Sequence, residues 1–164
     1  LAIRSSFRNV PRVLLPTELQ SDPASASERR IRVIPGREWR FFSAEAQQAL
    51  VEQPYRISND SERMGYRLTG AELKLDAALE LLSETVTFGT LQVPPNGQPI
   101  VLMADRQTTG GYPKIAHVAS VDLPLLAQRL PGEEVRFELI ELAAAQALAV
   151  RRARLIQQLE ALHA

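Results

Sequence analysis

Apolar residues gather in short runs along the chain, and proline, glycine and small polar residues separate these runs. Short runs of apolar, β-branched or aromatic residues between turn residues are typical of β-strands. The segments that fit this description are 31–34, 55–57, 64–68, 82–88, 100–104, 114–121 and 135–142. The pattern therefore predicts a mainly β fold built from several short strands.

Two of these segments carry a further signal. In 135–142 the apolar and charged residues alternate at first, as expected for a half-buried strand. In 100–104 every residue is apolar, which favours a central strand that is covered on both faces. The turn sequence PPNG at 94–97 precedes this strand, and the polar, glycine-containing segment 105–112 follows it. We therefore expect a buried strand that surfaces into a polar loop, where functional residues often gather.

Three segments have the signals of helices. Ser43 is a good N-cap for a helix over 44–51, and Asp122 is expected to cap a short helix through Arg129. The segment 143–164 is rich in alanine and contains no glycine or proline. It would be about 33 Å long as a continuous helix.

The C-terminal helix is expected to be amphipathic. Leucines fall on one stripe of it, with arginines nearby: Leu148, Leu155, Leu159 and Leu162, with Arg151, Arg152 and Arg154. A helix of this kind packs its apolar face against another surface. That surface is either the rest of this chain or another protein, and we expect a protein partner.

Length and composition favour one globular domain with extensions. The chain has 164 residues, of which 45% are hydrophobic and 23% are charged, a balance typical of soluble domains. Residues 1–30 contain prolines among short apolar runs and then the small, polar stretch SDPASASERR, so we interpret them as an arm and a linker. Residues 31–142 are predicted to form the β-domain and residues 143–164 the C-terminal helix.

Charge and residue usage argue against several classes of function. Nineteen basic and nineteen acidic residues give a net charge of zero, so the chain lacks the overall field that attracts nucleic acid or an acidic membrane. No segment approaches the ~20 apolar residues of a membrane span, and the first residues do not resemble a signal peptide. Cysteine is absent, which excludes disulfides and thiolate catalysis and fits a reducing compartment. We expect a cytoplasmic protein.

The loop 105–112, DRQTTGGY, brings an acid, a cation, an amide, two hydroxyls and two glycines to the end of a buried strand. In one interpretation the loop is a tight turn, in which Asp105 and Arg106 pair with each other. In the other, the threonine hydroxyls and the glycine amides form a concave set of donors for a carboxylate, a phosphate or an oxyanion. Lys114, just beyond the loop, would add a positive charge or be solvated.

A second candidate site is the segment RMGYR at 63–67, where Arg63 and Arg67 would lie on one face of a strand with Gly65 between them. Two interpretations are open here as well. The arginines either face solvent or use the gap over the glycine to clamp a planar anion, for which the guanidinium fork is suited. His117 and His163 lack the partners and spacing of a metal site, so no metal ligands are expected.

The segment QVPPNGQPIVLMADRQTTGGYPKIAHVASVDLPLLAQRLPGEEVRF resembles the biotin-dependent carboxyltransferase-like family. That family includes the C subunit of 5-oxoprolinase, allophanate hydrolase subunit 2 and the carboxyltransferase region of urea carboxylase. The resemblance covers residues 32–140, roughly, and is most specific at 92–113. RMGYRL at 63–68 is similar to a second family signature, in which Asp usually stands where this chain has Glu62. The resemblance implies a cyclophilin-like β-barrel.

The resemblance also implies a function, an ATP-dependent 5-oxoprolinase that opens the lactam 5-oxoproline to glutamate in a multi-subunit complex. Two alternatives stay open: a urea or amide carboxyltransferase that uses biotin, and a non-enzymatic regulatory module that binds a sister subunit. Family members carry a further N-terminal portion that has no counterpart in this sequence. We therefore expect that portion and a sister subunit as partners, and no activity for the chain alone.

Residue by residue, the resemblance implies two groups of site residues. The catalytic group would orient the amide and its oxyanion: Asp105, Gln107, Thr108 and Thr109. The second group would contact the substrate, with its two arginines on a carboxylate or phosphate: Arg63, Arg67, Gly110, Gly111, Tyr112 and Lys114.

Overall fold

The computed structural model describes residues 29–77 and 79–161. The predicted arm and most of the linker therefore lie outside the described residues. The strands are β1 (Ile31–Pro35), β2 (Tyr55–Ile57), β3 (Gly65–Thr69), β4 (Glu84–Thr85), β5 (Thr90–Gln92), β6 (Ile100–Leu102), β7 (Thr109–Gly110), β8 (Lys114–Val118), β9 (Glu134–Val135) and β10 (Phe137–Leu139). The helices are the 3-10 turn η1 (Trp39–Phe41), α2 (Ala44–Glu52), α3 (Leu123–Ala127) and α4 (Leu142–Ala161).

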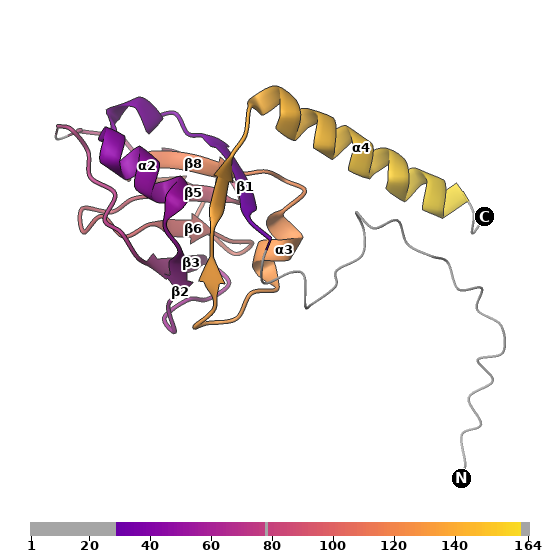
Figure 1. Cartoon of the computed structure of the whole chain (residues 1–164), viewed down its shortest axis with the longest axis horizontal. Coiled ribbons are helices and arrows are strands. Elements are labelled where there is room, and N and C mark those ends of the chain that lie inside the picture. The colour runs from indigo at the N-terminus through magenta and orange to yellow at the C-terminus, as the bar shows by residue number, and fades with distance from the viewer. Residues whose placement is uncertain (1–28, 78, 162–164) are drawn as a thin grey trace, which may run out of the picture.

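Eight of these strands form one sheet that curls into a barrel, in the order β10-β1-β8-β5-β6-β3-β2-β9 (Figure 1). The two ends of this order, β9 and β10, are consecutive segments of the chain with only Arg136 between them. Val135 pairs with Tyr55 of β2, while Phe137 pairs with Ile31 of β1. This bent segment thus joins the two edges of the sheet. The predicted mainly β barrel, with short helices and one long C-terminal helix, is confirmed.

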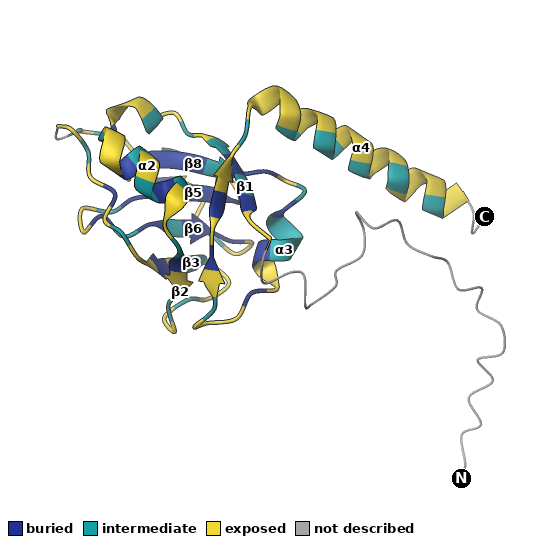
Figure 2. Ribbon diagram, in the orientation of Figure 1, coloured by how far each residue is buried: buried dark blue, intermediate teal, exposed yellow. Residues whose placement is uncertain are grey.

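The barrel interior is filled by side chains, so it is a core and not a channel. Its largest fully buried side chains include those of Tyr55, Phe42 and Phe137. The rings of Tyr55 and Phe137 are in tilted contact, with their centroids 6.0 Å apart, where the two edges of the sheet meet. Burial raises the pKa of Tyr55 to about 12. Figure 2 shows that the buried residues lie in the barrel and on the inner side of α2.

The sequence predicted most elements near their observed positions. Ser43 does cap α2, because its hydroxyl accepts a hydrogen bond from the Ala46 amide at 3.1 Å. The segment 100–104 does contain a central strand, since β6 lies between β5 and β3. That strand is shorter than expected, however: it ends at Leu102, and Ala104 is exposed.

Three expectations were wrong in detail. The predicted strand 82–88 shrinks to the two residues of β4, and β5, which pairs with both β6 and β8, was not predicted at all. The predicted strand 135–142 is broken at Arg136, where the chain changes from one partner strand to another. Asp122 does not cap α3, because its carboxylate instead accepts hydrogen bonds at 2.8 Å from the backbone and the guanidinium of Arg32. That bond raises the pKa of Arg32.

The helix α4 extends away from the barrel, and none of its described residues is buried (Figures 1 and 2). The long C-terminal helix is thereby confirmed. Leu148, Leu155 and Leu159 of the predicted stripe are half-buried, whereas Leu162 lies outside the described residues. Arg152 donates a hydrogen bond to the Val121 carbonyl at 3.3 Å, which ties one face of the helix to the barrel. Among the described residues, no helix combines the length and apolarity that crossing a bilayer requires.

Replacing Phe137 tests the role of the closing segment. Phe137→Ala should lower the free energy of unfolding by about 3–5 kcal/mol, because it leaves a cavity where the two sheet edges meet. Glu138→Ala, on the exposed side of the same strand, should change it by less than about 0.5 kcal/mol. Urea denaturation of both variants measures the difference. Equal effects would show that the segment 134–139 does not hold the barrel together.

Candidate functional site

A row of side chains crosses the outer face of the barrel at right angles to four neighbouring strands. Arg67 of β3 pairs with Ile100 of β6, Ile100 pairs with Gln92 of β5, and Gln92 pairs with Lys114 of β8. Neighbouring strands are about 4.8 Å apart, so the row is about 14 Å long from the first Cα to the last. A cation, an apolar side chain, an amide and a second cation thus follow one another across the sheet.

A cavity of about 540 Å³ lies over the first three positions of this row. Its wall is made of residues of β3 and β6, the end of β5, and the turns beside them. The lining residues are Ser58, Glu62, Met64, Gly65, Arg67, Leu68, Thr69, Gln92, Pro94, Asn96, Gln98, Pro99, Ile100, Leu102, Gln107 and Tyr112. Its volume lies within the range of small-molecule sites.

The structure brings together three of the residues that the sequence singled out. Arg67 comes from β3, Gln107 from the loop between β6 and β7, and Tyr112 from the segment between β7 and β8, and all three line the cavity. The remaining seven, all within the described part of the chain, do not line it: Arg63, Asp105, Thr108, Thr109, Gly110, Gly111 and Lys114. The two predicted motifs are therefore neighbours, but they do not form one site with all their members.

Arg63 and Asp105 join the two motifs through an ion pair. The Arg63 guanidinium contacts both carboxylate oxygens of Asp105, with Nε–Oδ2 at 2.9 Å and Nη2–Oδ1 at 3.2 Å. The Asp105 amide also donates to the Arg63 carbonyl at 3.0 Å. Asp105 therefore pairs with Arg63 and not with Arg106. Arg63 is 82% exposed and does not share the cavity with Arg67, so the two arginines do not form a clamp in this structure.

The guanidinium of Arg67 makes no hydrogen bond or ion pair within the described chain, although its backbone is held by Ser58 and Ser61. Ile100 packs beside Gly65, where a Cβ would lie 3.0 Å from the Ile100 Cγ2 atom. This glycine therefore leaves room for the apolar floor of the cavity, next to an arginine whose donors are available.

Gln92 is a cavity residue that the sequence did not single out. It is only 2% exposed, and its Nε2 atom has no hydrogen-bond partner among the described residues. Gly110 lies directly against this amide, since a Cβ at Gly110 would collide with Nε2. The buried glycine of the GG pair thus makes room for Gln92. The sequence signal for it was weak: a polar residue between Leu91 and Val93, just before the turn at 94–97.

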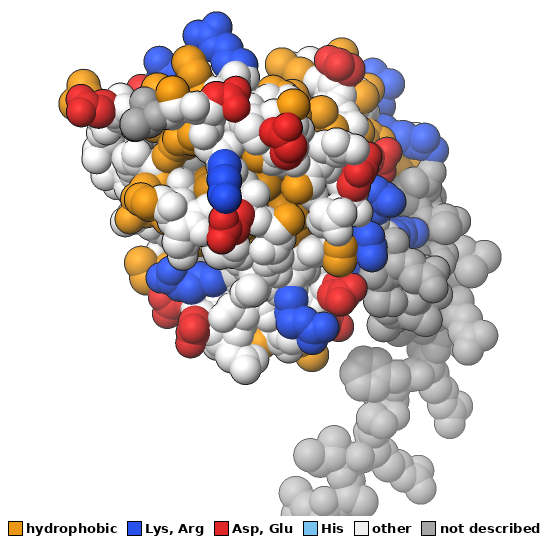
Figure 3. Space-filling view, turned by 60° about the vertical axis from the view of Figure 1, so that its left-hand side comes forward, with side chains coloured by type: hydrophobic (Ala, Val, Ile, Leu, Met, Phe, Trp, Pro, Cys, Tyr) orange, Lys and Arg blue, Asp and Glu red, His pale blue; other side chains and the backbone are white. Residues whose placement is uncertain are grey.

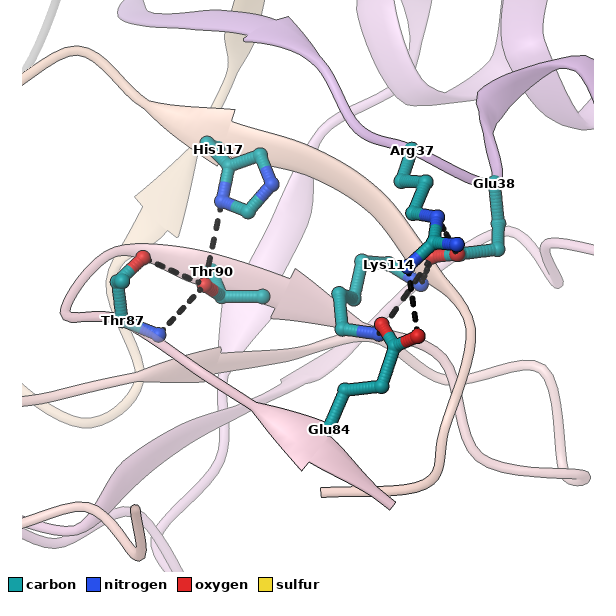
Figure 4. Close-up of polar contacts among 7 residues, drawn as sticks. All are labelled: Arg37, Glu38, Glu84, Thr87, Thr90, Lys114 and His117. Carbon is teal, nitrogen blue, oxygen red and sulfur yellow. Dashed lines mark hydrogen bonds and ion pairs between the residues drawn. The ribbon is translucent and has the colours of Figure 1, made fainter. Parts of the chain in front are cut away.

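The two-stranded ribbon of β4 and β7 carries Gly110 and is held over the sheet by charged side chains, shown in Figure 4. Glu84 of β4 contacts Arg37 at 2.6 Å and the Lys114 Nζ at 3.3 Å. These hydrogen bonds keep the pKa of Glu84 below its usual value. Lys114 was expected at the substrate or in solvent, but its side chain is 7% exposed and also lies 3.8 Å from the buried Glu38.

A second polar group continues along β8, at the other side of Figure 4. The Nδ1 atom of His117 is 3.2 Å from the Thr90 hydroxyl, which in turn is 3.2 Å from the Thr87 hydroxyl. Burial lowers the pKa of His117. The unfolded chain therefore binds this proton more readily, so His117 costs stability as the pH falls below about 6.5.

Figure 3 shows that acidic and basic side chains are interspersed on the side of the molecule that it presents. No patch of a single charge dominates this view, in keeping with the net charge of zero. The charged residues that line the cavity are Arg67 and Glu62.

The buried lysine gives a test of how the ribbon is held. Lys114→Met should lower the free energy of unfolding by about 3 kcal/mol, because it removes the buried cation beside Glu38 and leaves that buried carboxylate with only the exposed Arg37, at 3.8 Å. Lys74→Met removes a matched but exposed lysine, which pairs with Glu72 at 3.3 Å, and should cost less than about 1 kcal/mol. Thermal and urea unfolding measure both variants. A neutral Lys114→Met would argue that the ion pairs do not anchor the ribbon.

Comparisons with known proteins place this chain in a family. The family model for the carboxyltransferase domain, subdomain A and B, matches residues 1–139. The chain is 47% identical to the 5-oxoprolinase C subunit of Haemophilus influenzae over 118 residues, which is 72% of this chain and 38% of the relative. It is 49% identical to the 5-oxoprolinase C subunit of Escherichia coli over 108 residues, which is 66% of this chain and 35% of the relative. The chain thus spans little more than a third of these relatives' length.

Solved structures give the same fold. The crystal structure of the K. lactis urea amidolyase matches with a TM-score of 0.66 at 21% identity, over 71% of this chain and 8% of that one. At this identity the match concerns the fold alone. The family model, the relatives and the fold agree, and the chain belongs to the carboxyltransferase domain family, subdomain A and B.

Proposed function

We propose that the chain is part of a 5-oxoprolinase, which opens the lactam ring of 5-oxoproline to give glutamate in an ATP-dependent reaction of a multi-subunit complex. The observation that carries the proposal is the 47% identity to the C subunit of a 5-oxoprolinase, which extends over 72% of this chain. In the proposal, this chain contributes the cavity over β3, β6 and β5.

The free groups of the cavity suit this substrate. 5-Oxoproline is a five-membered ring that contains a planar amide and two methylene groups. A carboxylate is attached to this ring. The unpaired guanidinium of Arg67 is suited to the carboxylate, because it offers two parallel donors. Ile100 provides an apolar surface for the methylene groups, and the side chains of Gln92 and Gln107 offer amide groups to the lactam. Tyr112, which is 43% exposed, forms part of the cavity wall.

The predicted catalytic residues differ in how close they lie to the cavity. Gln107 lines the cavity and would contact the amide directly. Asp105 would act through Arg63, by fixing the start of the loop that carries Gln107. Thr108 and Thr109 are exposed and lie on or beside the ribbon, and their role in orienting the oxyanion stays a prediction.

ATP does not fit the cavity as this chain builds it. A triphosphate with its magnesium ion normally uses several cations or a cradle of backbone amides, together with carboxylates for the metal. The cavity offers one arginine and one acid, Arg67 and Glu62. Among the described residues, no cluster of three or more His, Asp or Glu side chains could hold a metal ion. We therefore place ATP elsewhere in the complex and route no step of the reaction through it here.

Removing the free arginine tests the proposed substrate. Arg67→Ala should weaken binding of 5-oxoproline at least tenfold, because a charge-assisted hydrogen bond is worth about 1.5–3 kcal/mol. Arg56→Ala is the matched control: Arg56 is an exposed arginine of β2 that pairs with Glu134 at 3.5 Å, outside the cavity. Calorimetric titration of 5-oxoproline into the 164-residue chain measures both. Equal affinity for the two variants would contradict the role of Arg67.

A protein partner for α4 is the second part of the proposal. The helix exposes apolar side chains, including Leu142, Val150 and Ile156. None of its described residues is buried. Exposed apolar surface of this kind often marks an interface. We expect a sister subunit of the same complex to cover it.

Leu155→Asp tests this interface, because it puts a charge into an apolar contact outside the barrel. The variant should lose binding to a 5-oxoprolinase sister subunit, while the barrel still melts cooperatively. Gln157→Asp, at an exposed position of the same helix, is the control and should bind as the parent does. Sedimentation of the mixed subunits measures assembly. If Leu155→Asp assembles normally, the helix is not the contact surface.

A further inference from the structure

The cavity contains two exposed side chains of opposite charge, Glu62 and Arg67. Within the described part of the chain, neither their carboxylate nor their guanidinium takes part in an ion pair, so the two groups do not pair with each other either. By contrast, the exposed Arg63 beside them pairs with Asp105 at 2.9 Å. Both charges of the cavity are therefore available to a ligand.

The backbone holds these two side chains on the same side of the sheet. Glu62 and Gly65 pair across a tight turn, in which each amide donates to the other carbonyl at 3.1 Å. Residues that pair in this way point to the same side, and so do Gly65 and Arg67, which are two positions apart on β3. The Cα atoms of Glu62 and Arg67 are therefore separated by about 9 Å, with Gly65 at the corner between them.

Gly65 keeps the space between the two charges open. A Cβ at this position would lie 3.0 Å from the Ile100 Cγ2 atom, so a side chain here would cover the apolar floor of the cavity. Ile100 and Leu102 both line this floor. A carboxylate, an ammonium group and an apolar surface, side by side, are what an α-amino acid presents. The guanidinium of Arg67 suits its carboxylate, and the carboxylate of Glu62 can accept from its ammonium group.

We infer that the cavity binds the zwitterionic head group of an α-amino acid, with the carboxylate at Arg67 and the ammonium group at Glu62. A dicarboxylate without the ammonium group would meet repulsion from Glu62 instead. The inference is independent of the proposed function in all but one point, since only the choice of glutamate as the amino acid rests on it.

Glutamate would retain the place of 5-oxoproline in the cavity. When the lactam ring opens, water adds across the C–N bond, so that the carbonyl carbon ends as a carboxylate and the nitrogen as an ammonium group. This nitrogen stays attached to the carbon that bears the original carboxylate, which is the group assigned to Arg67. Glutamate thus gains a charge that Glu62 can neutralise and that 5-oxoproline lacks. The product therefore competes with the substrate for this cavity.

The test compares two ligands that differ in the ammonium group alone, L-glutamate and glutarate. The 164-residue chain should bind L-glutamate about fivefold more tightly, as expected for an ion pair at a partly exposed site, measured by NMR titration. L-Glutamate should also displace bound 5-oxoproline. An affinity for L-glutamate that is no higher than that for glutarate would overturn the inference.

Variants of Glu62 separate its charge from its shape. Glu62→Gln keeps the size of the side chain but should abolish the preference for L-glutamate, whereas Glu62→Asp keeps the charge and should prefer L-glutamate still. Glu141→Gln, at an exposed glutamate outside the cavity, is the control and should bind as the parent does. All three should melt as the parent does, because Glu62 pairs with Gly65 through its backbone. If Glu62→Gln retains the full preference, the inference is wrong.

The same titrations distinguish the inference from the proposed function. If the chain prefers L-glutamate in a manner that depends on Glu62 but does not bind 5-oxoproline, the 5-oxoprolinase proposal fails and the amino-acid site stands. If the chain binds 5-oxoproline through Arg67 but does not prefer L-glutamate to glutarate, the inference fails and the proposed function stands.

Discussion

The pairing of the segment 134–139 with both edges of the sheet is the constraint on which the rest of the structure depends. On one side of Arg136 the chain pairs antiparallel with β2, and on the other side it pairs parallel with β1. The sheet thereby closes, and its inner face becomes a core filled by residues such as Tyr55 and Phe137. Because the interior is full, a ligand can meet this domain only at its outer face or its ends.

Polar and charged side chains on the outer face of the barrel form a row across the strands. The row Arg67, Ile100, Gln92 and Lys114 crosses four strands, and its two ends differ in character. At the β8 end, Lys114 is buried under the ribbon and neutralised by carboxylates. At the β3 end, Arg67 is exposed and its guanidinium is unpaired within the described chain. The same row thus combines a structural charge cluster with a cavity, and Gln92 lies at the boundary between them.

The periodicity of the sequence was enough to predict a mainly β fold, the central strand near 100–104 and the helices, whereas the barrel was expected from the resemblance to the carboxyltransferase-like family. Its failures have physical causes. The strand β5 was missed because Gln92 stands beside a run of prolines that marks a turn. The exact partners of Arg63 and Asp105 were also beyond prediction, since these residues are 42 positions apart and meet only because β3 pairs with β6. Sequence pattern indicates which face a residue occupies, but not which side chain from another strand will reach it.

The same limit applies to the candidate site, whose residues stay a prediction. The sequence singled out the loop 105–112 and the arginines near Gly65, and the structure places Arg67, Gln107 and Tyr112 of these in one cavity. The glycine pair was expected to let a substrate approach the backbone. In the structure, Gly110 instead accommodates the side chain of Gln92, a contact that depends on tertiary packing.

The cavity over Ile100 is, in our proposal, the place where 5-oxoproline binds. A crystal structure of the chain with 5-oxoproline tests this most directly. We expect the ring to lie over Ile100, with its carboxylate at the Arg67 guanidinium. A ligand bound elsewhere, for example between the ribbon and Arg63 with this cavity empty, would contradict the proposal.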